Sequence, residues 1–410
     1  MNNNCINYIH PTKKINTILL KLYNEIKNAE EYIESLKAKN KGNTFYNVKV
    51  DEIHNISQIP KPSTFPADGF PPEIRKHIDD FSMSKITYHI HLLDRKVTIY
   101  FLLEDMNPQT KMNLFNNYVD NMLIWLVLLN EYASKDCAEE LSIYIYLTSQ
   151  EKNMPSSNIY ILDEHNVNTA FTMTCPKISE IVIFRKEEWF KVFLHETFHN
   201  FGLDFSDLNN ESCNQRILTI FPVKSEVNLF EAYAEIWAKI MNACFCSYRS
   251  LSNKNNYTDF LNNCYFLINF ERAFCYFQMV KVLDFMNLTY QQLFKKGLKM
   301  NHLRETFYKE KTNVLSYYVI TLILLNSFTD FIHWCDVNNL NLLQFKKTTG
   351  NQDKFCRLIE EKYKSSLFLK NVRCTEIFLY KMKNHTNFTK NKKDSVYILE
   401  NLRMSLCELG

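Results

Sequence analysis

The sequence predicts an α+β protein in which a small mixed β-sheet and one buried helix are followed by a mostly helical C-terminal half. Apolar residues alternate with a period of two in several short segments between residues 81 and 185. The segment from Trp189 to Phe201 is apolar almost all round, which predicts a helix buried on every side. Beyond residue 228, apolar residues recur at helical spacing and glycines are few.

Three parts are expected along the chain, because 410 residues can bury a large core and divide into subdomains. Residues 1–80 contain a helix over 13–40 and then a connector over 58–73, which carries five prolines and one glycine. Residues 81–222 contain the sheet and the buried helix. Residues 223–410 form the helical subdomain.

The strands of the second part are short and separated by turn residues or by one helix. Two of them flank Asp94-Arg95 and predict a hairpin. His89 and His91 share one face of the first strand; two histidines at this spacing can chelate a metal, but a solvent-facing strand is the favoured interpretation. The predicted strands are 86–93, 96–103, 141–149, 168–174 and 180–185, with a helix over 108–134.

The third part is predicted to be a bundle of helices. Its most apolar run, 314–328, is short for a membrane span and contains Asn326, so we expect a buried bundle helix and no membrane span. The predicted helices are 228–250, 257–298, 312–337, 352–370 and 392–408.

The buried helix carries the motif His195-Glu196-Thr197-Phe198-His199. Residues four apart share one helix face, so both imidazoles can bind one zinc ion. Glu196 lies where it can take a proton from a metal-bound water. The alternative is a pair of buried histidines bonded to backbone carbonyls, but two histidines and a glutamate on an apolar helix are costly without a shared partner. Gly202 is expected to end the helix in a left-handed conformation.

A catalytic zinc site needs a third protein ligand and an open fourth position. The spacing His-x-x-Gly-x-x-His of metzincins fails, because its last position here is Phe205. Downstream, Glu231 and Glu235 lie four apart on one face of a predicted helix, where like charges repel unless each has its own partner. Glu231 could bind the zinc, and Glu235 could hold a ligating imidazole and fix its tautomer.

Alternatives to this ligand set remain open at the level of the sequence. Asn228-x-x-Glu231 is also a capping-box pattern, in which Glu231 would bond to the backbone at the start of its helix. Other residues near the motif could supply the third ligand, and the thiolate among them is the weakest candidate because thiolate zinc sites are more often structural. These rivals are Glu235, Asp204, Asp207, Glu211 and Cys213.

The motif followed by a helix reading Glu231-x-x-Ala234-Glu235 resembles the gluzincin metallopeptidases. The resemblance implies a zincin-like fold, with Glu231 as third ligand and Glu235 as the acid behind it. The sequence departs from the family pattern at Phe230, where the family often has Asn. The region 168–242 also resembles uncharacterised H-E-x-x-H proteins of large nucleocytoplasmic DNA viruses.

The net charge and the cysteines limit which partners and which cellular compartment we expect for the protein. The formal net charge of +3 supports neither a nucleic-acid nor an acidic partner. The twelve cysteines are scattered, and no two stand in a C-x-x-C pattern, which predicts reduced, buried thiols. The N-terminus has no apolar core of a signal peptide. We therefore expect an intracellular, cytoplasmic protein in a reducing compartment, which would be the host cytoplasm or the virion if the protein is viral.

The function expected from these features is zinc-dependent hydrolysis of peptide bonds in a polypeptide substrate, with Glu196 as general base. An edge strand, either 168–174 or 180–185, would pair with the extended substrate. Tyr317, Tyr318 and His333 are candidate donors to the developing oxyanion. Two alternatives are a metal-dependent hydrolase of other substrates and a catalytically silent zincin-fold structural or binding protein, such as a virion component. The sequence leaves the oligomeric state open.

Overall fold

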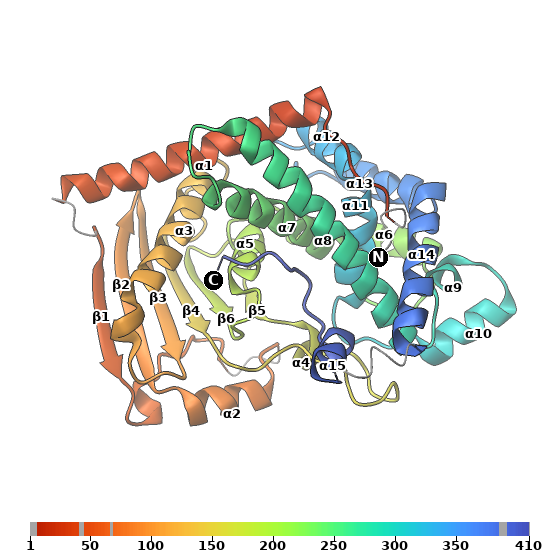
Figure 1. The fold of residues 1–410 in the computed structure, drawn as a ribbon, viewed down its shortest axis with the longest axis horizontal. Coiled ribbons are helices and arrows are strands. Elements are labelled where there is room, and N and C mark those ends of the chain that lie inside the picture. Colours follow the sequence, from red (N-terminus) through yellow and green to blue (C-terminus); the bar gives the residue numbers. More distant parts are fainter. Residues whose placement is uncertain (1–5, 41–44, 66–68, 385–391, 410) are drawn as a thin grey trace.

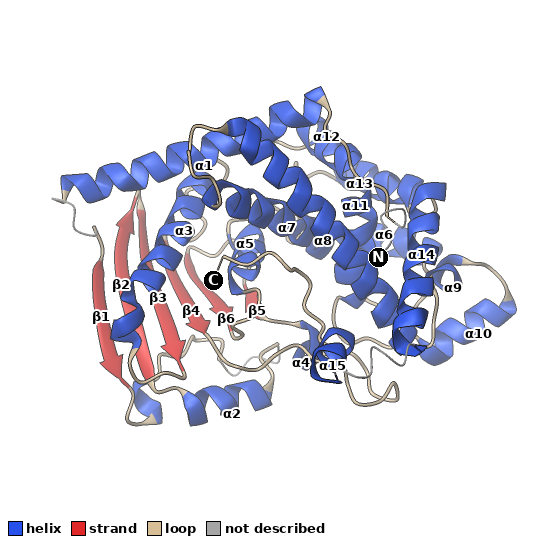
Figure 2. Ribbon diagram, viewed as in Figure 1, coloured by secondary structure: helices blue, strands red, loops and turns tan. Residues whose placement is uncertain are grey.

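The computed structural model describes residues 6–40, 45–65, 69–384 and 392–409, and it contains a six-stranded mixed β-sheet of order β1-β2-β3-β4-β6-β5 (Figures 1 and 2). β3, β4 and β6 run parallel to one another, whereas the other pairings are antiparallel. A mostly helical part follows the sheet, so the α+β class is confirmed. The strands are β1 (Asn47–Glu52), β2 (Ser84–Leu92), β3 (Arg95–Leu103), β4 (Glu140–Tyr146), β5 (Ala170–Thr172) and β6 (Ile178–Ile183).

The predicted hairpin is confirmed as β2 and β3. Leu92 pairs with Arg95, so the two-residue turn is Leu93-Asp94, one residue earlier than expected. The early turn lets the Arg95 guanidinium donate to the buried backbone oxygens of Cys137 and Ser134. His89 and His91 are exposed on β2, as the alternation predicted.

The first 80 residues contribute more regular structure than the sequence indicated. β1 adds an edge strand to the sheet, and its apolar alternation is weak because its residues are mostly exposed. A 3-10 turn, Ile56–Gln58, precedes the proline-rich connector, and the connector leads into α2 (Pro72–Phe81), where Pro72 starts the helix without needing an N–H partner. Ile74 and Ile78 of α2 pack on one face of the sheet, against Tyr146 and its neighbours.

The opposite face of the sheet is covered by α3 (Met112–Asn130) and by the motif helix α5 (Trp189–Asn200), while α1 (Lys13–Lys39) crosses over α3 (Figure 1). A 3-10 turn, Pro108–Lys111, precedes α3. Every side chain of α5 is buried, as its apolar circumference predicted. α4 (Glu164–Val167) is a single turn before β5. The motif helix is therefore a central element of the core.

The C-terminal part is a bundle with more breaks than the apolar spacing predicted. The helix expected over 257–298 ends at Phe285, where Asn287 takes a left-handed φ of 54°. The apolar run begins as a π-helical stretch, Leu315–Ile320, and is buried inside the bundle. The helices are α6 (Glu211–Ile220), α7 (Leu229–Arg249), α8 (Tyr257–Phe285), α9 (Tyr290–Phe294), α10 (Leu298–Phe307), α11 (Thr321–Asn326), α12 (Phe328–Asn338), α13 (Thr349–Lys362), α14 (Ser366–Asn384) and α15 (Lys392–Glu400).

No single helix in the described ranges is long and apolar enough to cross a membrane. Two consecutive helical segments, Leu315–Asn326 and Phe328–Asn338, are together long and apolar enough by length and composition alone. The chain bends by 90° between them.

The last described residues do not continue the helix that was expected over 392–408. After α15 the segment 401–409, dark blue in Figure 1, runs without regular structure from α15 to the start of α5. Glu188 accepts hydrogen bonds from the backbone N–H groups of Met404 and Ser405, and Glu271 accepts from those of Leu406 and Cys407. Buried carboxylates thus satisfy the backbone groups that a helix would have paired internally.

The expectation that all cysteines are reduced is wrong. Cys137 and Cys175 are joined by a disulfide, and Cys374 is disulfide-bonded as well. Cys137 follows α3 and Cys175 lies in the turn between β5 and β6, so tertiary packing alone brings them together. The inference of a reducing compartment loses its basis in the cysteines.

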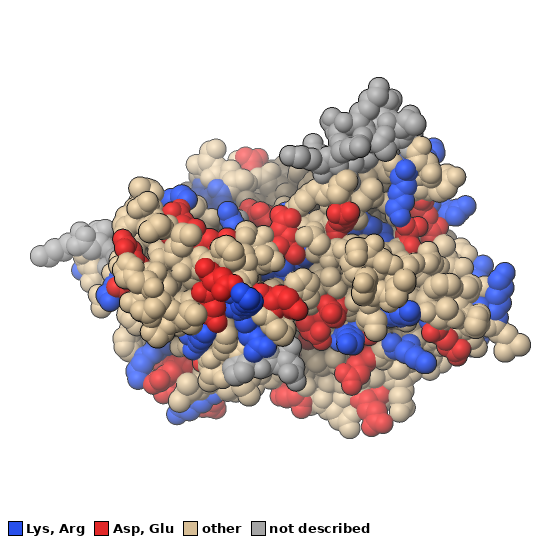
Figure 3. Space-filling view, turned by 90° about the horizontal axis from the view of Figure 1, so that it is seen from below, with Lys and Arg blue, Asp and Glu red and all other residues tan. Residues whose placement is uncertain are grey.

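Charged side chains of both signs are interspersed over the face drawn in Figure 3. Several pair with each other at the surface, as Lys96 does with Glu140 and Lys111 with Asp105. Exposed pairs of this kind contribute little to stability, because water and salt screen the attraction between the two charges.

Candidate metal centre

The helix α5, which packs on the sheet, and the helix α7 of the helical part bring together three side chains that can bind a metal ion. His195 and His199 lie one turn apart on α5 and face the first turn of α7, which carries Glu231. The His195 Nε2 and His199 Nε2 atoms are 3.1 Å apart, and the Glu231 Oε2 atom lies 3.1 Å from the first and 3.4 Å from the second. The three residues form a group that could hold a metal ion.

The spacing of these three atoms fits a tetrahedral metal site. Zinc binds nitrogen and oxygen ligands at about 2.0 to 2.2 Å, which places tetrahedral ligand atoms about 3.3 Å apart. A carboxylate faces the Nδ1 of each ring and favours the proton there, so each neutral ring presents the Nε2 lone pair. Three acceptor atoms converging in a buried site repel one another unless a positive charge lies between them. The group therefore has the chemistry of a cation site.

Glu235 holds the first imidazole in its ligating tautomer. Its Oε2 lies 3.1 Å from the His195 Nδ1, and the buried ammonium groups of Lys191 and Lys239 lie 2.9 and 3.3 Å from its Oε1. Burial by itself would raise the pKa of Glu235, but the two lysines and His195 outweigh it and hold this pKa well below its usual range. Glu235 therefore stays ionised and accepts the His195 Nδ1–H.

Asp204 plays the same part for the second imidazole. Its carboxylate accepts from the His199 Nδ1, and it is itself held by the backbone N–H and hydroxyl of Ser206, 3.0 and 2.8 Å away. Asp204 reaches the ring because α5 ends in a tight turn. Gly202 has a φ of +64°, and its N–H and that of Leu203 donate to carbonyls of the last helical turn. The predicted role of Gly202 as helix stop is confirmed.

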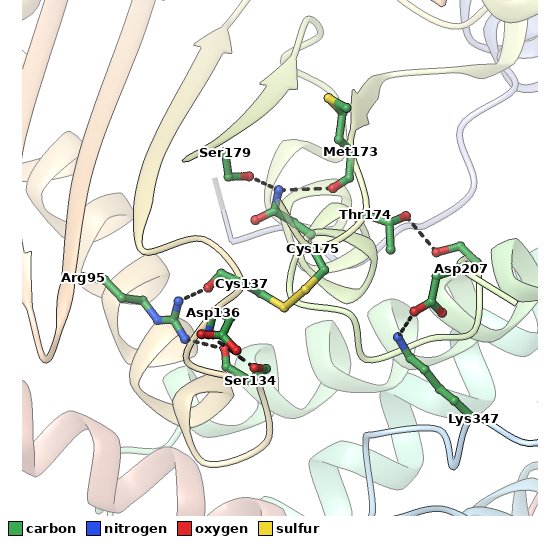
Figure 4. Close-up of a disulfide and its surroundings, with 12 residues drawn as sticks. Arg95, Ser134, Asp136, Cys137, Met173, Thr174, Cys175, Ser179, Asp207 and Lys347 are labelled. Atoms are coloured by element: carbon green, nitrogen blue, oxygen red, sulfur yellow. Dashed lines mark hydrogen bonds and ion pairs between the residues drawn. A yellow bond between two sulfur atoms is a disulfide. The ribbon is translucent and has the colours of Figure 1, made fainter. Parts of the chain in front are cut away.

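The disulfide lies directly against this turn. A Cβ on Gly202 would stand 3.4 Å from the Cys175 Cβ and 3.7 Å from the Cys137 Sγ. The neighbouring Thr174 hydroxyl is hydrogen-bonded to Ser206, and Asp207 pairs with Lys347 at 2.8 Å (Figure 4). The cross-linked loops thus brace the residues that follow α5, including the segment that orients His199.

Glu196 is buried beside His195 and does not belong to the ligand group. It lines a cavity of about 30 Å³ together with His195, Tyr317 and Ala170, and a cavity of this size has room for a water molecule. Burial raises the pKa of the Glu196 carboxyl, although both histidines oppose the rise. The Tyr317 hydroxyl donates to the Glu231 Oε2 at 2.9 Å. A carboxylate and a hydroxyl therefore both line the cavity beside His195.

The structure separates the alternatives that the sequence left open. The capping box is not formed: the Asn228 side chain makes no cap hydrogen bond and instead donates to Asn313. Asp207 and Glu211 are exposed, and Cys213 lies beside Cys356.

Of the three candidate oxyanion donors, only Tyr317 reaches the centre. The Tyr318 hydroxyl donates to the Leu402 carbonyl at 2.6 Å. His333 lies at the surface beside Lys14.

Some residues of the centre have roles that the sequence did not assign. The sequence indicates Asp204 only as a rival ligand, and it assigns no role to Lys191 or Lys239. Two features of the sequence could have indicated these roles. Asp204 is an acid two residues after the helix-ending Gly202, and both lysines lie on helices whose other residues are mostly apolar. A lysine is almost never fully buried without a charged partner, so its presence there indicates a buried acid nearby.

Comparison with known proteins adds no family: no protein-family model matches the chain, no curated protein matches its sequence, and no solved structure matches its fold. The resemblances to gluzincins and to viral proteins stay predictions.

Replacing Asp204 by Asn is expected to weaken zinc binding by about 10- to 100-fold, because the amide cannot hold the His199 Nδ1–H as a carboxylate does. The measurement is competition for zinc with a chromophoric chelator. Glu211→Gln, an exposed carboxylate on α6, is the control and should leave the affinity unchanged. Equal affinities for the two variants would contradict the role assigned to Asp204.

Proposed function

We propose that this protein is a zinc-dependent metallopeptidase of gluzincin type with a zincin-like fold. The observation that carries the proposal is the position of Glu196: this buried carboxylate lines a cavity beside His195 and does not belong to the group of His195, His199 and Glu231. A structural metal site has no use for such a carboxylate. A hydrolase requires one, since a water has to lose a proton as it attacks.

The residues present fit zinc. Two imidazole nitrogens and one carboxylate oxygen are the donor set of catalytic zinc sites, and the adjoining cavity leaves a further position open. Zinc held there supplies a Lewis acid and lowers the pKa of a water in that position. Glu235 and Asp204 keep both histidines in the ligating tautomer, and the lysines around Glu235 keep that carboxylate ionised.

Glu196 is suited to proton transfer. Its raised pKa, caused by burial, makes it a stronger base than an exposed glutamate. In the proposed reaction, Glu196 takes a proton from the attacking water and delivers it to the leaving amine. Tyr317 stands beside Glu231, from where its hydroxyl can turn to the oxyanion that forms on the scissile carbonyl.

A peptide is the favoured substrate because a free strand edge borders the cavity. β5 is the edge strand nearest the centre, and Ala170 lines the cavity. The Phe184 N–H donates to the Thr169 carbonyl, and residues of β5 pair antiparallel with β6, so the backbone groups of Ala170 and Thr172 point away from β6. An extended peptide can pair with these groups and lie across the centre.

Tyr317→Phe is expected to lower kcat by about 10²- to 10³-fold with zinc content unchanged, because it removes one donor to the oxyanion and no ligand. The measurement is steady-state kinetics on a cleaved peptide beside zinc analysis. Tyr318→Phe is the matched control: it removes a buried hydroxyl bonded to Leu402, so it should lower stability and leave kcat near wild type. Parallel losses of kcat in the two variants would rule out a specific role for Tyr317.

The proposed function is tested by incubating the zinc-loaded full chain with a library of unstructured peptides and identifying new termini by mass spectrometry. Cleavage that stops with a chelator and returns with zinc supports the proposal. A panel of ester, phosphoester and non-peptide amide substrates runs in parallel. Hydrolysis confined to that panel would replace the peptidase by another hydrolase, and no hydrolysis of either set by the loaded protein would overturn the enzymatic proposal.

A further inference from the structure

Six of the buried or half-buried thiols stand in pairs. The Cys244 Sγ on α7 lies 4.0 Å from the Cys264 Sγ on α8. Two other pairs are in thiol–thiol contact, one between Cys246 of α7 and Cys407 of the C-terminal segment, and one between α6 and α13. This last pair is Cys213 and Cys356. Cys244–Cys264 joins the consecutive helices α7 and α8, whereas the other two pairs join segments that are 161 and 143 residues apart in sequence.

The position of Cys407 is fixed by its neighbours on both sides. Its backbone N–H donates to Glu271 at 2.7 Å, and its carbonyl accepts from the Asn242 side chain, also at 2.7 Å. Asn242 and Cys246 lie four residues apart on α7 and share a face of that helix. The backbone contacts therefore hold the Cys407 thiol over Cys246, independently of any attraction between the two sulfurs.

Other roles for these thiols are not supported. Thiolate zinc sites need three or four ligands, whereas in the described part of the chain only the His195, His199 and Glu231 group qualifies as a metal cluster. A reactive cysteine needs a lowered pKa, but contact with Cys264 and burial raise the pKa of Cys244. Contact with Cys246 and burial likewise raise the pKa of Cys407, whereas contact with Cys356 lowers that of Cys213. Paired, mostly buried sulfurs are the arrangement found at structural disulfides.

We propose that Cys244–Cys264, Cys246–Cys407 and Cys213–Cys356 are sites of disulfide formation, so that this chain folds oxidatively with Cys137–Cys175 already bonded in the structure. The Cys244 and Cys264 sulfurs need to approach by about 2 Å to reach bonding distance. The remaining cysteines in the described ranges without a thiol neighbour are Cys275 and Cys335.

The chemistry requires an oxidant, and a low-molecular-weight disulfide such as oxidised glutathione supplies it. One cysteine thiolate attacks the glutathione disulfide, forms a mixed disulfide and releases one glutathione. The second cysteine thiolate attacks the mixed disulfide and releases the other. Two protein thiols are thereby oxidised, one glutathione disulfide is reduced to two thiols, and those thiols take up the two protons. Because the thiols are buried in the folded chain, the exchange takes place during folding.

The cross-links would surround the metal centre. Cys244 and Cys246 belong to α7, the helix that presents Glu231 and Glu235. Their bonds would tie this helix to α8 and to the C-terminal segment, while Cys137–Cys175 already braces the turn after α5. The inference does not depend on the proposed peptidase activity, since it follows from thiol geometry alone.

The test is disulfide mapping of the full chain refolded from denaturant in a buffer of oxidised and reduced glutathione. Free thiols are blocked with an alkylating agent in denaturant, and the protein is digested without reduction and analysed by mass spectrometry. We expect cross-linked peptides for the three pairs, with Cys275 and Cys335 alkylated. Alkylation of all six paired cysteines in protein that has regained its native circular dichroism would overturn the proposal.

Cys244 and Cys246 lie on one tryptic peptide, so single substitutions are needed to assign their partners. Cys246→Ser should abolish the link to Cys407 and keep the link to Cys264, and Cys244→Ser should do the opposite. Cys335→Ser is the control for burial of a serine and should leave all links intact. Links that exchange partners between the two variants would contradict the pairing read from the structure. Mapping is done on the correctly folded fraction, so loss of yield in one variant does not obscure the result.

Discussion

Zinc is expected to be lost from the protein when His195 is replaced by Ala or Glu231 by Gln. Each change removes one of three converging ligand atoms and leaves two, which do not form a closed site. The loss in affinity should exceed the roughly 10- to 100-fold that removal of an orienting partner costs. Elemental mass spectrometry of purified protein gives the zinc content, and we expect about one ion per wild-type chain.

Thermal unfolding provides a second readout of the same loss. A ligand present at about 1,000 times its dissociation constant stabilises the folded state by about 4 kcal/mol. Chelation should therefore lower the melting temperature of the wild type but not that of His195→Ala. Glu211→Gln, an exposed carboxylate on α6, is the control and should behave as wild type.

The variants also distinguish Glu231 from Glu235 as the third ligand. Glu235→Gln should keep zinc with reduced affinity, because Glu235 contacts the His195 Nδ1 and not the converging atoms. Retention of zinc by Glu231→Gln together with its loss from Glu235→Gln would move the ligand one turn along α7. Absence of zinc from folded wild type, even after zinc is added back, would remove the metal centre altogether.

Glu196→Gln is expected to abolish peptide cleavage while the protein keeps its zinc. The amide has nearly the same shape as the carboxylate but cannot accept a proton from water. Loss of a positioned general base lowers the rate by about 10²- to 10⁴-fold. The measurement is kcat on a peptide cleaved by the wild type, with zinc content determined on the same sample.

This variant also separates the catalytic protein from a silent one. If wild type and Glu196→Gln bind zinc equally and neither cleaves peptides nor other hydrolysable substrates, the centre is structural or binds a partner without chemistry. If Glu196→Gln loses zinc, the glutamate supports the ion itself and its assignment as base is wrong. Glu211→Gln again serves as the control for an unspecific effect of the substitution.

Much of the fold was predictable because it depends on local patterns. The apolar spacing of α1 and α3, the alternation of β2 and β3, and the apolar circumference of α5 each specify one element and its buried face. The elements that were missed carry weak local signals. β1 is mostly exposed, and α2 follows a proline-rich stretch whose composition indicates a connector. The segment 401–409 has helical apolar spacing, but buried carboxylates compete for its backbone.

The features of the candidate centre likewise fall into those that local sequence determines and those that tertiary packing determines. The sequence by itself determined that His195 and His199 share a helix face, that Glu196 follows the first of them, and that Gly202 ends the helix, because all three depend on residues within two turns. Only the tertiary structure decided that Glu231 meets the two histidines, that Asp204 and Glu235 orient them, and that Cys137 bonds to Cys175. These contacts join side chains whose distance is set by how α5, α7 and the strand loops pack, and no spacing along the chain encodes that packing.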